Sequence, residues 1–137
     1  TVSSTPADFV KLLERTKGAK IILAHMGGWR NWDQVEELLP HTHVYLDTAY
    51  ALGRIAHRGD GHFAPEELEL MSASQFLRMV DTFGAHRVLF GTDSPWTGQA
   101  ESIAWLRALP GLTAPEREAI LGGNAAALLG LEPGQTA

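Results

Sequence analysis

The chain has 137 residues, of which 45% are hydrophobic and 20% are charged, as expected for about one globular domain. Its net charge of −5 argues against a nucleic-acid partner, and the absence of cysteine excludes disulfides and thiolate metal sites. Apolar runs are far shorter than the roughly 20 residues that span a membrane. No signal peptide is visible, so we expect a cytoplasmic protein without a membrane partner.

The first half of the chain predicts two helices and a strand between them. Residues 5–8 (TPAD) combine a hydroxyl cap, an early proline and an acid, and apolar residues continue this helix toward Gly18. Residues 20–25 (KIILAH) form a continuous apolar run that suits a strand covered on both faces. The apolar spacing over residues 32–39 then predicts a helix that ends at the following proline.

The second half repeats the alternation of strand and helix. Residues 44–48 (VYLDT) are an expected strand, and residues 50–66 an expected long loop with room for a helical turn. Apolar periodicity predicts a helix over residues 72–84, before a third strand at 87–91. Three further helices are expected: one after Gly98, one at 114–121 that starts with the capping box TAPE, and one at 124–129 that Gly122-Gly123 separates from it.

Strands that alternate with helices predict an α/β fold with a parallel sheet and right-handed crossovers. In such folds ligands bind at the carboxyl ends of the strands. His25, Asp47 and Asp93 each lie at the carboxyl end of an expected strand. We therefore expect these side chains to share the rim of one pocket.

A rim with one histidine and one or two aspartates supports two kinds of chemistry. It can bind a metal such as zinc, or it can transfer protons between imidazole, carboxylate and substrate. Structural alternatives stay open for each residue. His25 can simply cap a strand end, Asp93 can form an Asx turn before Ser94-Pro95, and Asp47 is better explained as structural than as catalytic.

The remaining histidines and tryptophans are weaker candidates. His41 and His43 precede their strand and are expected to lie away from the rim. The predicted substrate contacts are Trp29, His57 and Trp96, with His62 a further loop histidine that can reach the pocket; Trp32 is assigned to the core by its helical spacing.

Four segments together resemble a known family: IILAHMGG (21–28), VYLDTA (44–49), RVLFGTDSPW (87–96) and ILGGNAAALLGL (120–131). In this order and spacing they are similar to the carboxyl-terminal half of a metal-dependent hydrolase of the amidohydrolase superfamily. The most similar group is the amidohydrolase-related one, which also contains aminocarboxymuconate semialdehyde decarboxylase.

The resemblance implies a (β/α)₈ TIM barrel with a divalent metal, expected to be zinc, at its carboxyl face. Residues 1–137 would form the carboxyl-terminal part, about strands six to eight. His25 would be the sixth-strand histidine that polarises the substrate or metal-bound water. Asp93 would be the eighth-strand aspartate, both a metal ligand and a proton acceptor.

The rest of the family pattern is not found in this sequence. Family members carry an HxH motif on the first strand and a histidine on the fifth, and a barrel needs eight strands and about 250 residues. The chain begins with Thr1. We therefore expect an amino-terminal half that is encoded separately, removed by proteolysis or lost by truncation, or else a homo-oligomer that covers the open sheet.

Three functions are compatible with this pattern. The first is a metal-dependent hydrolase that attacks a small substrate with metal-activated water, in which case this chain alone is expected to be inactive. The second is a non-oxidative decarboxylase on the same scaffold. The third is a non-catalytic half-barrel that serves as a binding module.

Overall fold

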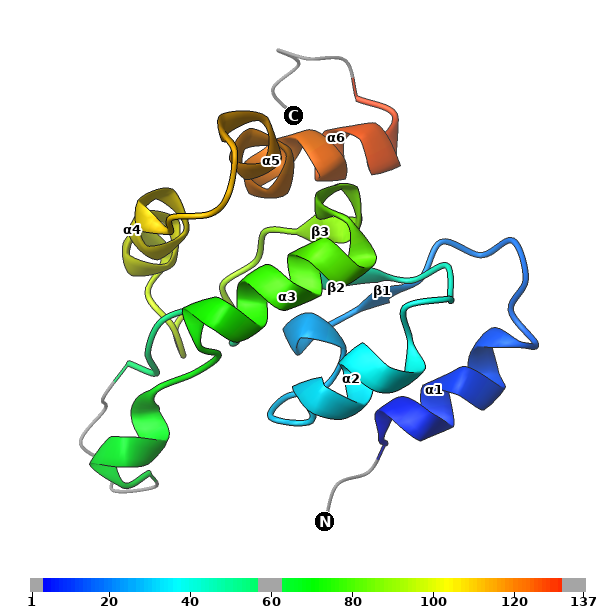
Figure 1. Ribbon diagram of the computed structural model, residues 1–137, viewed down its shortest axis with the longest axis horizontal. Coiled ribbons are helices and arrows are strands. Elements are labelled where there is room, and N and C mark those ends of the chain that lie inside the picture. The colour runs from blue at the N-terminus through cyan, green and yellow to red at the C-terminus, as the bar shows by residue number, and fades with distance from the viewer. Residues whose placement is uncertain (1–3, 57–62, 132–137) are drawn as a thin grey trace.

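The computed structural model describes residues 4–56 and 63–131, which form an α/β fold around a small parallel sheet (Figure 1). The strands are β1 (Ile22–Leu23), β2 (Tyr45–Asp47) and β3 (Val88–Leu89). The α-helices are α1 (Pro6–Leu13), α2 (Trp32–Leu38), α3 (Ala73–Phe83), α4 (Gln99–Ala108), α5 (Ala114–Glu118) and α6 (Asn124–Leu129). The short 3-10 segments are η1 (His25–Gly27), η2 (Pro65–Leu68) and η3 (Ala85–Arg87), and η4 (Ala119–Gly123) is π-helical.

The strands run parallel in the order β1-β2-β3, as the alternation of elements predicts. Leu46 of β2 is in register with Leu23 on one side and Val88 on the other. Each strand is shorter than the apolar run that predicted it. An apolar run indicates that its residues are buried, whereas a strand also requires regular hydrogen bonds to a neighbouring strand. At the end of β1, for example, His25 already turns into η1 with a φ of 58°.

The hydrophobic core lies between the sheet and the helices in front of it. Leu23, Leu46 and Val88 share one buried cluster with Val35 of α2 and Phe76 of α3. Figure 1 shows α3 in front of the strands and α2 below them. Each fully buried side chain of this size contributes about 1.5–3 kcal/mol to folding through the hydrophobic effect.

Gly27 allows the loop after β1 to pack directly on this core. Its φ is +86°, and a Cβ at this position would lie 2.9 Å from Cγ1 of Val35 and 3.1 Å from Cδ2 of Leu46. Any larger residue would push the loop away from the sheet, and this is the loop that carries His25.

The opposite face of the sheet is incompletely covered at β1. Ile22 and Leu23 point to opposite faces, and the Ile22 side chain is 48% exposed while Leu23 is 5% exposed. Parallel strands normally carry cover on both faces. The described part of the chain therefore leaves an apolar position open at the β1 edge of the sheet.

The helices at the end of the chain form one continuous helical run. The Gly122-Gly123 pair, expected to separate two helices, instead belongs to η4, which joins α5 to α6. The Asn124 side chain donates hydrogen bonds to the carbonyl oxygens of Ala85 and Val88, both at 2.7 Å. These tertiary contacts hold the run against the start of β3. Among the described helices, none combines the length and apolar character needed to cross a bilayer.

Helix α5 begins with the predicted capping box. Glu116 N–H donates to the Thr113 hydroxyl at 3.3 Å, and Thr113 N–H donates to Oε2 of Glu116 at 2.8 Å. The Thr113 hydroxyl also donates to the same carboxylate oxygen, at 2.7 Å. The hydrogen bonds from the backbone and the side chain of Thr113 lower the pKa of Glu116 below its usual value.

This lowered pKa predicts a pH-dependent contribution to stability. Because the pKa of Glu116 is lower in the folded state, its carboxylate stabilises the protein above the unfolded-state pKa, and this stabilisation is lost as pH falls through the folded-state pKa. We expect wild type to melt above Glu116→Gln at neutral pH and the difference to vanish in acid. Thermal unfolding followed by circular dichroism measures this, with Glu118→Gln as control. A difference that is independent of pH would contradict it.

Candidate active site

A pocket of about 440 Å³ lies at the carboxyl ends of the strands. Its walls come from the segments that follow β1, β2 and β3 and from one aromatic residue ahead of η2. The lining residues are His25, Trp29, Tyr50, Phe63, Asp93 and Trp96. The structure thus brings together four of the residues selected from the sequence: His25, Trp29, Asp93 and Trp96.

His25 is held through its backbone and its ring. Its N–H donates to Oδ1 of Asp47 at 3.1 Å, and its carbonyl accepts a hydrogen bond from the Trp32 indole at 2.9 Å. Its Nδ1 lies 2.9 Å from the carbonyl oxygen of Ala49. Because a carbonyl only accepts, Nδ1 carries a proton, and in the neutral form of the ring the lone pair is therefore on Nε2.

Asp47 connects the segments that follow β1 and β2. Its Oδ1 accepts hydrogen bonds from the N–H groups of His25 at 3.1 Å and Ala49 at 3.0 Å. Burial raises the pKa of the Asp47 carboxyl; the two backbone donors and the His25 ring oppose this rise, while the negative charge of Asp93 adds to it. These contacts support the structural interpretation of Asp47.

Thr48 ties the segment after β2 to the segment after β3. This residue is 1% exposed, and its hydroxyl donates to the Gly91 carbonyl at 2.8 Å while accepting from the Gly91 N–H at 3.0 Å. Its own N–H donates to the Leu89 carbonyl at 2.9 Å. The pairing of the two strands therefore continues past the ladder and sets the point from which Asp93 projects.

Asp93 lies in a tight turn after β3 with a φ of 56°. The turn is closed by its backbone carbonyl, which accepts a hydrogen bond from the Trp96 N–H at 2.9 Å. Within residues 4–56 and 63–131 the carboxylate itself accepts no hydrogen bond, so the Asx-turn alternative has no side-chain contact to support it. The carboxylate is exposed and lies in the wall of the pocket.

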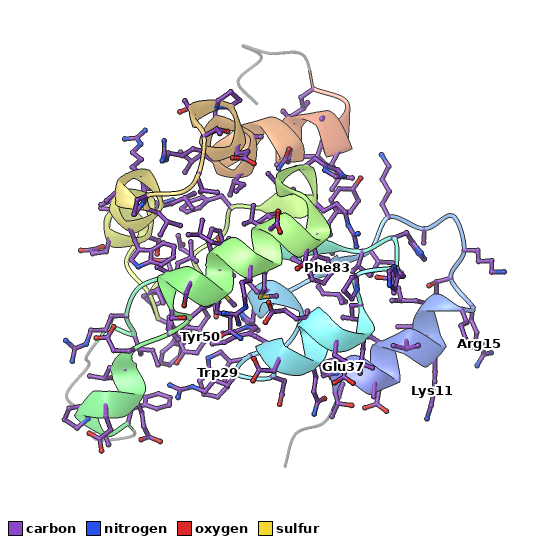
Figure 2. All side chains as sticks on the ribbon, in the orientation of Figure 1. Lys11, Arg15, Trp29, Glu37, Tyr50 and Phe83 are labelled. Atoms are coloured by element: carbon purple, nitrogen blue, oxygen red, sulfur yellow. The ribbon has the colours of Figure 1, made fainter. Side chains whose placement is uncertain are left out.

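Aromatic rings form most of the remaining wall. Trp29 and Tyr50 stack with centroids 5.6 Å apart and an interplanar angle of 30°, and Figure 2 shows them side by side. Tyr50 also meets the His25 ring edge-on at 6.1 Å, and Phe63 meets Trp29 edge-on at 6.4 Å. The guanidinium of Arg30 lies 4.9 Å from the centroid of the Trp29 ring. The wall is therefore aromatic and largely apolar, which suits a ligand that carries a ring.

Backbone strain is concentrated at this pocket. In the described part of the chain, the non-glycine residues with positive φ are His25, Met26, Arg30, Tyr50 and Asp93. Three of these five residues line the pocket. For such residues the left-handed region costs roughly 1–2 kcal/mol each, and strain of this kind gathers at functional sites.

Two groups of the pocket have the donor chemistry of metal ligands. These are the Nε2 lone pair of His25 and the carboxylate of Asp93, and both suit a divalent metal such as zinc. Across residues 4–56 and 63–131, no three His, Cys, Asp or Glu side chains are grouped so that they could hold a metal ion. The described residues therefore fit part of a ligand set.

This partial set predicts weak metal binding by the chain alone. A catalytic zinc site usually has three protein ligands, so we expect this chain to bind zinc weakly or not at all. Metal analysis after dialysis, together with titration calorimetry, measures the stoichiometry and affinity. A tight, stoichiometric zinc load that Asp93→Asn removes would contradict the expectation.

The other predicted residues lie elsewhere. His57, a predicted substrate contact, falls outside the described residues, as does His62. His41 and His43 are exposed and precede β2, at the end of the sheet opposite the pocket, as expected. Trp32 is buried in the core.

Sequence reasoning missed Tyr50 and Phe63. For Tyr50 a signal was present. An aromatic residue follows each polar strand-end residue by three or four positions, as Trp29 follows His25 and Trp96 follows Asp93. Tyr50 follows Asp47 in the same way, and this pattern would have predicted it.

In this chain the segments that follow the three parallel strands converge on one pocket. This arrangement is typical of α/β proteins that bind ligands at the carboxyl ends of their strands. The chain belongs to the amidohydrolase family, because the family model described as Amidohydrolase matches residues 1–131. The resemblance found in the sequence is thus confirmed. Comparison with curated proteins finds no match.

Solved structures with a similar fold include a TIM-barrel protein, an amidohydrolase and a decarboxylase. An uncharacterized TIM-barrel protein from Bordetella bronchiseptica has 22% identity and a TM-score of 0.68, over 91% of this chain and 39% of that one. A zinc-bound amidohydrolase from Burkholderia multivorans has 22% identity and a TM-score of 0.65, over 93% and 49%. A dihydroxybenzoic acid decarboxylase from Polaromonas sp. JS666, bound to manganese and 2-nitroresorcinol, has 19% identity and a TM-score of 0.59, over 91% and 39%.

The chain therefore spans between 39% and 49% of the length of these proteins. The expected fold class is confirmed at this level: a small parallel α/β sheet similar to part of a TIM barrel.

Proposed function

We propose that this chain forms part of the active site of a metal-dependent hydrolase, which cleaves a small substrate with metal-activated water. The observation that carries this proposal is the convergence of His25 and Asp93 on one pocket at the carboxyl ends of the strands. Membership of the amidohydrolase family, and zinc or manganese in structures of the same fold, support a divalent metal. An amino-terminal half or a second copy of the chain would supply the remaining ligands.

Asp93 would hold the metal in this arrangement. When bound, a divalent metal lowers the pKa of a coordinated water and polarises the substrate. The Asp93 carboxylate accepts no hydrogen bond from the described residues, so its oxygens are available to bind the cation and to accept a proton.

His25 would act through Nε2. With Nδ1–H held by the Ala49 carbonyl, Nε2 of the neutral ring would accept from Asp93 the proton that this carboxylate takes from the attacking water. The resulting imidazolium then donates Nε2–H to the developing oxyanion and passes the proton to the leaving group. The Ala49 carbonyl keeps its hydrogen bond throughout and stabilises the charged ring.

The aromatic wall favours a second candidate, a non-oxidative decarboxylase. A planar ring acid would lie against Trp29 and Tyr50, with its carboxylate toward the metal side. The C–C bond breaks to release carbon dioxide, and the ring carbon takes a proton from His25 or Asp93. Decarboxylases of the same fold are known among the similar structures.

Product analysis separates these candidates. The natural gene product that carries these residues is loaded with zinc or manganese and incubated with small esters, lactones and amides, and separately with hydroxybenzoic acids. Hydrolysis without carbon dioxide supports the hydrolase, whereas stoichiometric carbon dioxide supports the decarboxylase. Turnover of neither set by a metal-loaded preparation would favour the non-catalytic binding module.

A further inference from the structure

We infer that Tyr50 is a substrate-binding residue of this pocket, whose phenol O–H donates a hydrogen bond to an oxygen atom of a planar substrate lying between His25 and Asp93. The inference rests on the proposed function in one respect, because it takes this pocket to be the substrate site. It adds a polar contact that fixes how the substrate is oriented.

Tyr50 contacts both segments that carry the proposed catalytic groups. Its ring meets the ring of His25 edge-on at 6.1 Å. Its N–H donates to the Thr92 carbonyl at 3.4 Å, next to Asp93 in the chain. A ligand in the pocket that touches His25 and Asp93 therefore also meets Tyr50.

The hydroxyl of Tyr50 is available to a ligand. Across residues 4–56 and 63–131 it makes no hydrogen bond, although the residue is half-buried and its ring is packed on two sides. Buried tyrosine hydroxyls usually find a partner. A phenol stays protonated near neutral pH and is therefore a donor, which suits a carbonyl, carboxylate or phenolate oxygen.

The backbone makes tyrosine an unexpected choice at this position. Its φ is 51°, a region that glycine and asparagine adopt far more readily than an aromatic residue. Gly53, three residues later in the same loop, also has a positive φ, of 74°. Backbone strain at a residue such as Tyr50 gathers at functional sites, which supports a role for its side chain in the pocket.

A pair of isosteric probes tests the hydroxyl directly. Acetophenone and α-methylstyrene have the same shape, but only acetophenone carries an acceptor oxygen. We expect wild type to bind acetophenone more tightly and Tyr50→Phe to lose about 3- to 10-fold of that preference, the range for one neutral hydrogen bond. Quenching of tryptophan fluorescence measures both affinities. Tyr45→Phe is the matched control, since Tyr45 lies on β2 outside the pocket lining.

Several results would overturn the inference. These are a wild type that shows no preference for acetophenone, a Tyr50→Phe variant that keeps the full preference, and a variant that weakens both probes equally. The proposed function is judged separately by turnover. If turnover is absent but the Tyr50-dependent preference is present, the proposed function falls and the hydrogen bond of Tyr50 stands as a ligand contact of a binding pocket. If turnover is present but Tyr50→Phe leaves the preference unchanged, the inference falls and the proposed function stands.

Discussion

Asparagine in place of Asp93 is expected to abolish turnover of the active enzyme while the fold stays intact. The amide has nearly the same shape as the carboxylate, but it has no negative charge to bind a cation and does not accept a proton. Losing a carboxylate with these roles costs about 10²- to 10⁴-fold in kcat. Asparagine tolerates the φ of 56°, and the backbone bond from Trp96 N–H is unaffected. Steady-state kinetics and circular dichroism measure activity and fold together.

A matched control is available on α3. Asp81 is exposed and does not line the pocket, so Asp81→Asn makes the same chemical change away from the site. We expect this variant to retain wild-type turnover. Near-normal turnover by Asp93→Asn would remove Asp93 from the catalytic role.

His25→Asn is expected to have the second large effect, a loss of roughly 10²- to 10⁴-fold in kcat. Asparagine accepts the φ of 58° and keeps the backbone contacts with Asp47 and Trp32, so the change is confined to the ring. The pH dependence of kcat should change as well, because proton transfer through Nε2 is lost. Rate measurements across the pH range test both statements.

His43→Asn is the corresponding control, because His43 is exposed and precedes β2. Its kcat and pH profile should match wild type. If His25→Asn lowered kcat only slightly and left the pH profile unchanged, the imidazole would be a structural cap of the strand end.

The alternation of elements could be predicted from the sequence because it depends on local signals. Apolar runs, capping residues and prolines are short-range features, and they correctly predicted a parallel sheet with a helix after each strand. The prediction for the Gly122-Gly123 pair was wrong, because glycine weakens a helix without ending it. Tertiary contacts, such as those of Asn124 with Ala85 and Val88, carry the helical run through that pair.

The candidate site could be predicted where topology alone places a residue. His25 and Asp93 follow parallel strands, so their segments must meet at one edge of the sheet. Phe63 could not be found in this way, because its position depends on a long loop. The structural role of Asp47 was expected, but its two N–H partners could not be predicted, because their positions follow from loop geometry.

The double hydrogen bond between Thr48 and Gly91 has a consequence for how such proteins diversify. It fixes the point from which the segments after β2 and β3 leave the sheet together. Under the proposed function, exchanges of pocket side chains beyond this point, such as Tyr50 or Trp96, would change ligand preference while the strand ends stay in place.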